Sequence, residues 1–456
     1  MQYLGGLQLR TVGKKYRFNK FCIKVEVEEG TLIYNGLSGA MVMIKPVELM
    51  NIETEDPCDY VDFLISHWFL VPIKYDEEAI LSIIKERKRT ILNDTYLDHP
   101  EHFTILTTSA CNARCFYCYE LGIKNKTHMS QETAEKVAKY IIKYAPRDKR
   151  VTLDWFGGEP LLNHKIISII SSRVRSAGFD IFGTMISNGY LFDDNLIKVA
   201  KEDWNLQNIQ ITLDGTEEVY NKTKNYVYKN DENPFKRVID NIHKLTDNKI
   251  FVSIRMNCDK HNFEDLIKLV HYLHEEFKDN NLISMYVWPV FEEGFERSDE
   301  ERTNLFKSIQ KVEDTMFEYG YDLGHNITSE INSIHCMADR GNAICIFPKG
   351  EIGVCEHYLD SKFVSHIDNP NEKNWDVLKE WRNYTPYTEV CKDCPLKPLC
   401  LRLKGCTDAE PCCEQQKIYM LEHYKKSIIK EWNNYKNNKN NSCKDSCCAK
   451  PDCYQH

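Results

Sequence analysis

The segment "TTSACNARCFYCYE", residues 107–120, places three cysteines, Cys111, Cys115 and Cys118, within eight positions. One loop with this spacing can wrap three thiolates around a compact centre. A structural zinc site is closed by four protein ligands, and an iron–sulfur cubane ordinarily takes four cysteines. Three thiolates therefore leave one iron open to a substrate or cofactor, and Tyr117 can pack against that molecule.

Four further stretches carry polar residues or glycines directly after expected strands. Paired glycines let the backbone approach a ligand closely, a carboxylate suits an ammonium group, and a guanidinium grips a carboxylate bidentately. Each stretch alone could be a turn or a satisfied strand end, but they arrive in order, one per strand. They are "WFGGEP" with Gly157, Gly158 and Glu159, "ISNGY" with Ser187 and Asn188, "ITLDG" with Thr212 and Asp214, and "SIRMN" with Arg255 and Asn257.

The elements that must position these residues alternate between strand and helix from about residue 103. Such alternation predicts βα units and a parallel sheet, with chemistry at the carboxyl ends of the strands. Six units form an open or partial barrel, and the three-cysteine loop follows its first strand. The expected strands are 103–109, 151–156, 180–187, 208–213, 249–257 and 282–290, with helices near 130–145, 163–176, 192–202, 234–246 and 262–277.

The cysteine spacing, the aromatic Tyr117 and the place after strand one resemble the motif of radical S-adenosylmethionine (SAM) enzymes. The resemblance implies that SAM completes a 4Fe–4S cluster and is cleaved to methionine and a 5′-deoxyadenosyl radical, which abstracts hydrogen from a substrate. It also implies that the four strand ends contact SAM. Glu159 and its glycines would bind the amino group, Ser187 and Asn188 the ribose or carboxylate, and Arg255 the carboxylate.

Two further cysteine-rich segments follow the expected barrel. A Cys-x₂-Cys pair on a tight turn is a strong metal-ligand signal, although zinc and iron–sulfur sites share it. Two closed four-cysteine zinc sites are therefore the alternative. "CMADRGNAICIFPKGEIGVCEHY" holds Cys336, Cys345 and Cys355, and "CKDCPLKPLCLRLKGCTDAEPCC" holds Cys391, Cys394, Cys400, Cys406, Cys412 and Cys413.

This order resembles the SPASM extension of radical SAM enzymes, which carries two auxiliary 4Fe–4S clusters, so that three clusters are expected in total. The chain departs from the family pattern between Cys400 and Cys406, where five residues stand in place of three. Cys345 could be a ligand or a strand core residue. The resemblance implies a first auxiliary site of Cys336, Cys355, Cys406 and candidate Cys345, and a second of Cys391, Cys394, Cys400 and either Cys412 or Cys413.

The fold expected from these patterns is α/β, a partial (β/α)6 TIM-like barrel between an amino-terminal winged-helix-like module and a carboxyl-terminal cysteine-rich iron–sulfur domain. Residues 1–95 contain the hairpin "FCIKVEVEEGTLIYNG" and helical stretches around 59–68 and 77–91. Such a module can hold a peptide as an added strand. "TLIYNGLSGAMVMI" and "WFLVP" resemble the peptide-recognition element of maturases of ribosomally made peptides, although a structural cap is the alternative.

The remaining boundaries place the barrel at 96–325, the SPASM domain at 326–435 and a polar tail at 436–456. The tail is rich in Asn and Lys, and it is expected to be poorly ordered. Its four cysteines match no motif, so a metal, a redox or no role stays open. They are Cys443, Cys447, Cys448 and Cys453.

Composition excludes several classes of protein. The formal net charge of −9 over 456 residues argues against general affinity for nucleic acid or anionic membranes. No apolar run approaches the roughly 18 residues of a membrane span, and "MQYLGGLQLRTVGKK" lacks a signal-peptide apolar region. We therefore expect a cytoplasmic protein, where 19 cysteines indicate metal ligation rather than disulfides.

The function that these resemblances favour is oxidative crosslinking of a precursor peptide that carries a leader sequence. A Cys-derived thioether, as in sactipeptides and ranthipeptides, is preferred over a carbon–carbon crosslink. The substrate alternative is formylglycine formation, as in anaerobic sulfatase maturases, which carry an acidic general base where this chain has Glu356, directly after Cys355. Glu356 could equally be a surface residue on a hairpin. Flavodoxin or ferredoxin is the expected electron donor, and a non-enzymatic electron-transfer or zinc scaffold is the third hypothesis.

Overall fold

The structure of the chain is a computed structural model. The residues that the structure describes are 15–53, 60–95, 99–122, 126–230, 233–290, 297–321, 337–339, 342–357, 362–382, 388–400, 412–442 and 453–454.

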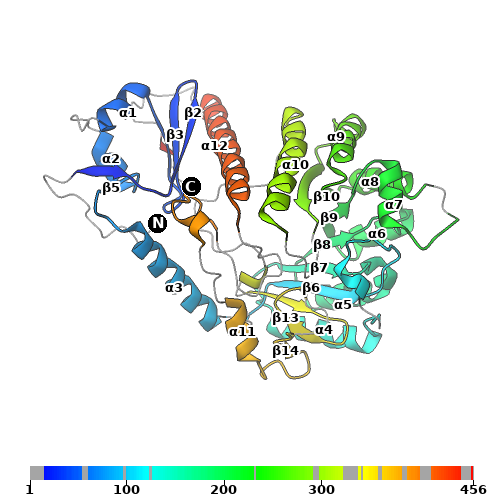
Figure 1. The fold of residues 1–456 in the computed structure, drawn as a ribbon. Helices are drawn as coiled ribbons and strands as arrows, with labels where there is room; N and C mark the ends of the chain where they lie inside the picture. Colours follow the sequence, from blue (N-terminus) through cyan, green and yellow to red (C-terminus); the bar gives the residue numbers. More distant parts are fainter. Residues whose placement is uncertain are drawn as a thin grey trace.

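A nine-stranded sheet forms the centre of the molecule (Figure 1). Its order is β11-β10-β9-β8-β7-β6-β12-β13-β14, and the six strands from β6 to β11 are parallel, which confirms the α/β fold with a parallel sheet. The chain returns after the last helix of this region to place β12 parallel to β6. The strands are β6 (His102–Thr108), β7 (Val151–Gly157), β8 (Ile181–Ser187), β9 (Leu206–Thr212), β10 (Phe251–Cys258), β11 (Ile283–Pro289), β12 (Ala343–Ile346), β13 (Glu351–Gly353) and β14 (Ser365–His366).

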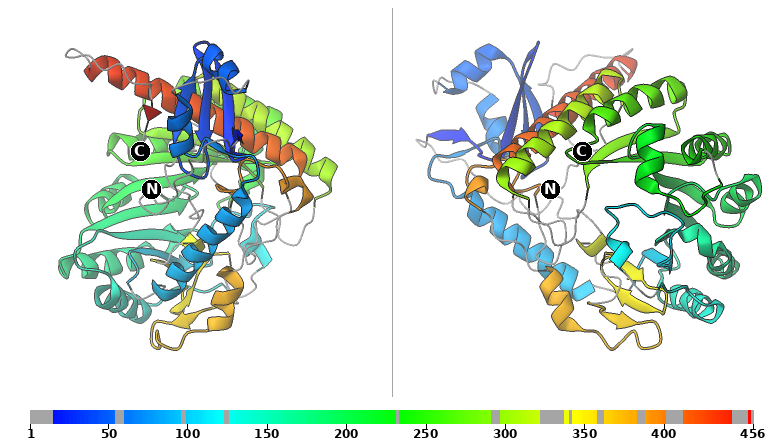
Figure 2. Two further views of the ribbon diagram at one scale, coloured as in Figure 1. Left: turned by 90° about the vertical axis from the view of Figure 1, so that its left-hand side faces the viewer. Right: turned by 45° about the vertical axis from the view of Figure 1, so that its right-hand side comes forward.

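Helices cover the convex face of this sheet (Figure 2). Several begin at side-chain caps, which satisfy backbone N–H groups that have no partner inside the helix: Ser130 caps α4, Asp193 caps α6, and Ser298 forms a capping box with Glu301 at α10. The helices are α4 (Gln131–Tyr144), α5 (His164–Ser176), α6 (Asp194–Glu202), α7 (Glu217–Lys224), α8 (Pro234–Asp247), α9 (Phe263–Phe277) and α10 (Asp299–Glu318), with short 3-10 turns η1 (Tyr119–Gly122) and η2 (Pro160–Asn163).

The strands alternate between an apolar and a more polar face. In β7 the side chains of Leu153 and Trp155 are fully buried in the main hydrophobic core, whereas Asp154 between them is partly exposed. Successive side chains of a strand point to opposite faces, so Asp154 lies on the concave side. The same alternation continues in β8, where Thr184 takes the concave position. The core therefore sits between sheet and helices, and the concave face is left for polar groups.

A second sheet lies near the amino terminus, with the order β15-β4-β3-β2. The expected hairpin is confirmed: β2 and β3 pair in antiparallel register from Cys22↔Asn35 to Val27↔Gly30. A separate antiparallel pair joins β1 and β5. The elements are β1 (Tyr16–Phe18), β2 (Cys22–Val27), β3 (Gly30–Asn35), β4 (Met41–Ile44), α1 (Pro46–Glu53), α2 (Tyr60–Ser66), β5 (Leu70–Pro72) and α3 (Glu77–Thr95).

The longest helix, α12 (Glu414–Ser442), joins the two sheets. It packs on one face of the amino-terminal sheet, where Ile428 and Trp432 contact a cluster that includes Ile23 and Leu32, and it also lies against α10 (Figure 1). Helix α12 runs through residue 436, where the sequence suggested that a polar tail begins. The remaining elements are η3 (Met337–Asp339), α11 (Trp375–Arg382), η4 (Glu389–Cys391) and β15 (Cys453–Tyr454), the last of which pairs with β4.

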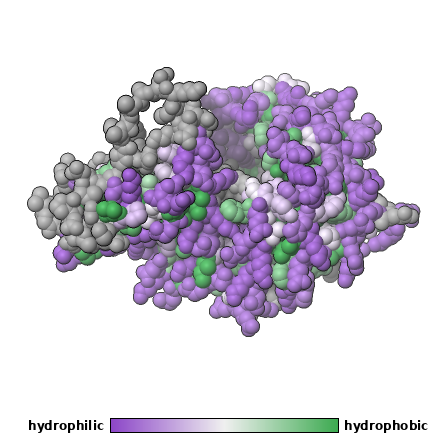
Figure 3. All heavy atoms as spheres, turned by 90° about the horizontal axis from the view of Figure 1, so that it is seen from above, coloured by the Kyte–Doolittle hydropathy of each residue, from purple (hydrophilic) through white to green (hydrophobic). Residues whose placement is uncertain are grey.

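The surface seen from above is mostly hydrophilic, with hydrophobic side chains scattered in small groups (Figure 3). Within the described part of the chain, none of the helices combines the length and the apolar character needed to cross a membrane.

Candidate active site

The three-cysteine loop directly follows β6, as the sequence predicted, and Cys111, Cys115 and Cys118 are all half-buried. Burial raises the pKa of the Cys111 thiol to about 12 and that of Cys118 to about 11. The charge of Cys115 adds to both shifts, so the three thiols face one small volume.

This volume fits an iron–sulfur cluster. Its donors are three thiolates, the soft ligands that such clusters take. Two polar side-chain atoms beside the cysteines, Asn112 Nδ2 and Glu120 Oε2, are buried without a hydrogen-bond partner in the described parts of the chain. Buried polar atoms are ordinarily satisfied, so these two indicate room for a further polar group at the loop. In the same described residues, no three His, Cys, Asp or Glu side chains converge on a single metal ion.

The two glycines at the end of β7 hold the sheet against the cysteine loop. Gly158 N donates to Thr108 O at 3.0 Å, and Glu159 N donates to Ala110 O at 2.9 Å. A Cβ atom on Gly157 would stand 2.1 Å from Thr108 O, and one on Gly158 would stand 2.5 Å from Ala110 O. Gly157 also has a φ of +130°, which side chains with a Cβ rarely adopt. The glycines therefore permit a close approach of the backbone to the loop itself.

The carboxylate of Glu159 is fully buried and points toward the end of β8. Its Oε1 accepts from Ser187 Oγ at 2.9 Å and its Oε2 accepts from Asn188 N at 2.9 Å. Burial raises the pKa of Glu159 to about 7. Asn188 continues the network, since its Nδ2 donates to Asn112 Oδ1 at 2.7 Å and lies 3.9 Å from Cys111 Sγ. Glu159, Ser187 and Asn188 thus converge on the cysteine loop.

The ends of β9 and β10 meet the loop at Tyr117. The Tyr117 hydroxyl donates to Asp214 Oδ2 at 2.5 Å, and Asn257 Nδ2 donates to Asp214 Oδ1 at 3.0 Å. Arg255 Nε donates to Asn257 Oδ1 at 2.9 Å, and Thr212 pairs with Arg255 in the sheet register. All the strand-end residues singled out in the sequence therefore lie at one rim of the sheet. Whether each contacts SAM stays a prediction.

Sequence reasoning missed Lys224, the last residue of α7. Its side chain is 3% exposed, and its Nζ lies 2.8 Å from Asp214 Oδ2 and 3.2 Å from the Tyr117 hydroxyl. Burial by itself lowers the pKa of Lys224, but the negative charge of Asp214 and those of neighbouring groups together outweigh it, so the pKa lies well above its ordinary value. Lys224 O also accepts from Arg114 N at 2.8 Å. The sequence feature that could have identified Lys224 is its position four residues after Tyr220, which places both side chains on the same buried face of the helix.

The segment after β13 brings the carboxyl-terminal region to the same rim. The rings of His357 and Tyr119 meet edge to face, with centroids 4.7 Å apart. Burial raises the pKa of Tyr119 and raises that of Asp154 to about 6, and the charge of Glu356 adds to both shifts. The charge of the predicted general base, Glu356, therefore acts on both Tyr119 beside the cysteine loop and Asp154 in β7. Its catalytic role stays a prediction.

Cys345 is fully buried in β12 in a cluster with Leu106 and Phe347. Burial raises its pKa well above the ordinary value, and the charges of Glu356 and Cys355 add to the shift, so Cys355 lies near it. The surroundings are those of a strand core residue that has a second thiol close by. Cys336 and Cys406, the other predicted ligands of the first auxiliary site, fall outside the described residues.

The second auxiliary set lies between the amino-terminal module and α12. Cys394 N donates to Cys391 O at 3.1 Å, which closes the Cys-x₂-Cys turn. Burial raises the pKa of Cys394, and the charge of Cys400 is among the smaller contributions, so these thiols are near neighbours. Cys412 and Cys413 precede α12, and Cys413 is buried. Cys443, Cys447 and Cys448 lie outside the described residues, and Cys453 is the first residue of β15.

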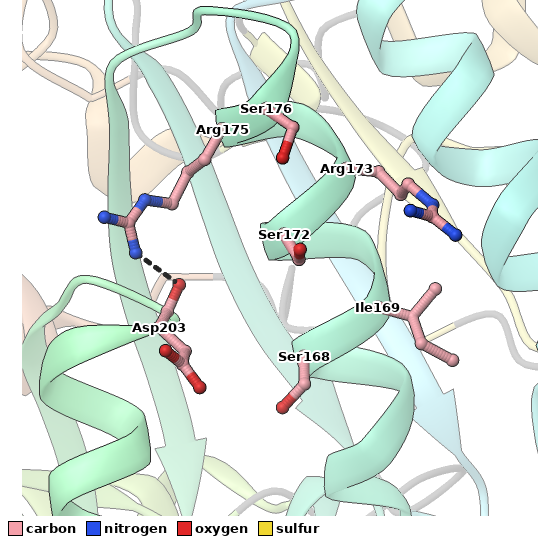
Figure 4. A pocket seen from close by; sticks show the side chains of 7 residues that line it. All are labelled: Ser168, Ile169, Ser172, Arg173, Arg175, Ser176 and Asp203. Atoms are coloured by element: carbon pink, nitrogen blue, oxygen red, sulfur yellow. Dashed lines mark hydrogen bonds between the residues drawn. The ribbon is translucent and has the colours of Figure 1, made fainter.

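Two cavities differ in their relation to this rim. A cavity of about 680 Å³ lies on the outer helical layer, beside α5 and Asp203, and none of the cysteines lines it (Figure 4). Its arginines are engaged, since Arg173 binds Glu135 and Arg175 binds the Asp203 carbonyl oxygen. A second cavity, of about 210 Å³, lies on the strands themselves and includes Asp154 and Gln210.

Residues 105–273, which carry the cysteine loop and the first five strand ends, match the sequence model described as the Radical SAM superfamily. The chain contains a radical SAM domain. The matched residues include the cysteine loop after β6 and the strand ends after β7 to β10, which together form the rim described above.

Curated relatives of the radical SAM domain differ in their reactions. A probable GTP 3′,8-cyclase of Methanococcus maripaludis is 28% identical over 29% of this chain and 42% of its own. A Cysteine-type anaerobic sulfatase-maturating enzyme of Clostridium novyi is 24% identical over 37% of this chain and 46% of its own. The radical SAM cyclopropyl synthase TigE of Paramaledivibacter caminithermalis is 22% identical over 67% of this chain and 66% of its own. The first two alignments span less than half the length of those relatives.

Solved structures share the fold over a longer part of the chain. Native anSMEcpe with bound AdoMet matches with a TM-score of 0.55 and 18% identity, and the match covers 75% of this chain and 99% of that one. SuiB of Streptococcus suis bound to S-adenosylmethionine matches with a TM-score of 0.50 and 14% identity, over 84% of this chain and 94% of that one. At these identities the likeness concerns the fold.

Proposed function

We propose that the protein is a radical SAM peptide maturase that installs an oxidative crosslink, by preference a Cys-derived thioether, in a ribosomally made precursor peptide. The observation that carries the proposal is the convergence of four strand ends on the loop with Cys111, Cys115 and Cys118. When bound there, a 4Fe–4S cluster and SAM supply a 5′-deoxyadenosyl radical for hydrogen abstraction.

The chain's own residues would hold the loop and orient SAM. Three cysteines ligate the cluster, and the hydrogen bonds of Tyr117 and Asn188 hold the loop in one conformation. The Glu159 carboxylate is occupied by Ser187 and by backbone N–H groups, so the polar backbone of Gly157 and Gly158 is the better placed contact for the SAM amino group. Arg255, half-buried at the end of β10, is available to the SAM carboxylate.

Three observations support a peptide substrate. The sulfatase-maturating relative acts on a protein, as its name states, and anSMEcpe has also been solved with a bound Cp18Cys peptide. In the amino-terminal sheet the outer side of β4 is paired with β15 at Val42 and Met41, so a leader that added a strand there would take the place of β15. We propose that the leader of the precursor pairs with β4 in the same way.

The remaining parts of the proposal concern the outcome of the reaction. The cysteines of the two auxiliary sets, among them Cys355 and Cys391, would hold clusters that supply an electron acceptor for the oxidation of the substrate. Flavodoxin or ferredoxin would be the electron donor in the cytoplasm. Glu356 would deprotonate a substrate thiol or a radical intermediate, because its charge acts on Tyr119 beside the cysteine loop. The same position suits a formylglycine-forming maturase, which is the second candidate function.

The test is an anaerobic turnover with SAM, a reductant and the short cysteine-containing peptide encoded nearest to this gene, followed by mass spectrometry. We expect 5′-deoxyadenosine, loss of two hydrogens per crosslink and thiols that resist alkylation. Cys115→Ala should abolish 5′-deoxyadenosine, whereas Cys22→Ala, a thiol in the amino-terminal sheet, should not. Free thiols with 5′-deoxyadenosine would favour formylglycine or a carbon–carbon crosslink, and no SAM cleavage by the loaded enzyme would refute the proposal.

A further inference from the structure

The cavity of about 210 Å³ occupies the concave face of β7, β8, β9 and β10. Its walls come from neighbouring strands in register: Asp154 lies beside Thr184, Ile186 beside Gln210, and Gln210 beside Ser253. The cavity is thus lined by residues of the regular sheet rather than by a loop.

The cavity lies directly below the predicted SAM contacts. Ile186 precedes Ser187 in β8, and Ser253 precedes Arg255 by two positions in β10. Strands rise about 3.3 Å per residue, so the upper wall of the cavity lies about 3–7 Å from the rim along the strands. A group held in the cavity would place the atoms just above it next to the source of the radical.

Asp154 gives the cavity its chemical character. Its carboxylate accepts from Thr184 Oγ1 at 2.6 Å and from Thr104 Oγ1 at 3.3 Å, and both donors are neutral. No basic side chain pairs with Asp154 in the described part of the chain. Burial raises its pKa to about 6, and the charge of Glu356 adds to that shift, so the group is mostly ionised at neutral pH. A half-buried carboxylate with neutral donors alone is costly, and a cation relieves the cost.

The other walls suit a long side chain with a polar end. Phe251 and Ile186 offer apolar surface for a methylene stem, Thr184 lies beside the carboxylate, and Gln210 offers a further hydrogen-bonding group on β9. Gln210 Oε1 already accepts from the Tyr286 hydroxyl at 2.6 Å, which fixes the orientation of its amide. Lysine and arginine combine such a stem with a cationic head.

We infer that this cavity is a substrate pocket that takes the cationic side chain of a lysine or arginine residue of the peptide and pairs it with Asp154. The inference rests on the proposed function for its peptide substrate, and it deepens that function by naming a residue type that must stand near the modified position. The negative formal charge of the chain, −9, favours the approach of such a peptide.

The test uses N-acetyl-lysine methylamide and its uncharged analogue N-acetyl-norleucine methylamide as probes of the reconstituted, oxidised holoenzyme with SAM. Saturation-transfer NMR titrations give the dissociation constant of each probe. A charge-assisted pair should make the lysine probe bind about tenfold more tightly. Equal dissociation constants in the wild-type enzyme would overturn the inference, and this comparison requires no variant.

Substitutions of Asp154 test whether the preference for the lysine probe arises in the cavity. Asp154→Asn should reduce the ratio of the two dissociation constants to about one, and Asp154→Glu should keep the lysine preference. Asp180→Asn is the matched control, because it removes one charge from the opposite, exposed end of β8. A preference that survives Asp154→Asn, or one that Asp180→Asn also removes, would contradict the assignment.

The outcome is separable from that of the proposed function. 5′-Deoxyadenosine formation is measured in the same wild-type preparation after reduction, without either probe. No SAM cleavage together with a lysine preference would refute the radical function and leave the cationic pocket standing. SAM cleavage without a lysine preference would refute the pocket alone.

Discussion

At the scale of single residues, the charges that matter most are those that solvent cannot reach. Lys224 and Asp214 are both almost completely buried and form one ion pair, which the Tyr117 hydroxyl joins. Removing one member of such a pair leaves the other as an uncompensated buried charge. Lys224 is thereby a positioning residue for the loop, because it acts through Tyr117 and through its own carbonyl oxygen.

Lys224→Met keeps the methylene stem and removes the ammonium group. We expect a loss of about 3–5 kcal/mol in the free energy of unfolding, because Asp214 is left buried and unpaired. Iron content after reconstitution should also fall, since Tyr117 loses one of its partners. Urea unfolding and iron analysis are the measurements. Lys222→Met, on the exposed face of the same helix, should change stability by less than about 0.5 kcal/mol. Equal effects of the two variants would contradict this role.

Asp154→Asn should affect stability in a pH-dependent way. The pKa of Asp154 is raised from 3.8 to about 6 in the folded protein, so between these values the folded state binds the proton more tightly than the unfolded state. Its contribution to stability therefore falls as pH rises through that window and stays unfavourable above it. Asparagine carries no charge, so the variant should have the higher melting temperature at neutral pH, and this advantage should shrink toward about pH 4. The same difference at both pH values would refute the burial of the charge.

At the scale of elements, the end of β7 decides how closely the sheet approaches the cysteine loop. Two successive N–H groups, those of Gly158 and Glu159, donate to the loop backbone, and this leaves no room for a Cβ atom at the glycines. The paired glycines of "WFGGEP" are consequently a packing requirement of the loop as well as a feature of the rim.

Gly157→Ala tests this close approach. The new Cβ would stand 2.1 Å from Thr108 O at a φ of +130°, so the variant should lose both stability and cluster content. Gly178→Ala is the control, because Gly178 has a φ of +87° with nothing within 4 Å of a built Cβ. The control should lose only about 1–3 kcal/mol in the free energy of unfolding, because backbone strain is its single cost. Urea unfolding of both variants compares them, and a loss for Gly157→Ala no larger than the control would show that the loop can move away.

At the scale of the whole molecule, α12 connects the two ends of the chain. Its inner face covers the amino-terminal sheet, and α1 and α2 cover the opposite face of that sheet with residues such as Leu64. The helix also lies against α10, the helix that follows β11 (Figure 2). The amino-terminal sheet is consequently held to the radical SAM domain through a helix that comes almost 400 residues later in the chain.

Ile428→Ala should loosen this connection. Ile428 is fully buried between α12 and the sheet, so the cavity should cost about 2–5 kcal/mol. Ile418→Ala on the same helix is the matched control, because Ile418 is 48% exposed and its loss should cost much less. Thermal unfolding and limited proteolysis measure the difference. Similar losses for both variants would mean that the helix does not hold the sheet.

The sequence by itself determined the six parallel strands, most of their helices and the place of the cysteine loop. These follow from local causes: the alternation of strand and helix periods, the caps, and the short spacing of Cys111, Cys115 and Cys118. The strand-end residues could also be predicted from the sequence, because the carboxyl ends of parallel strands lie at one rim of the sheet.

Only the tertiary structure decided what depends on contacts between distant segments. The burial of Lys224 against Asp214, the pairing of β12 with β6 beside Cys345, and the packing of α12 on the amino-terminal sheet leave no periodic signal. The cavity at Asp154 is of the same kind, since its walls come from four strands. Local patterns report which face of an element is apolar, whereas the partner of that face is chosen by the packing of the entire chain.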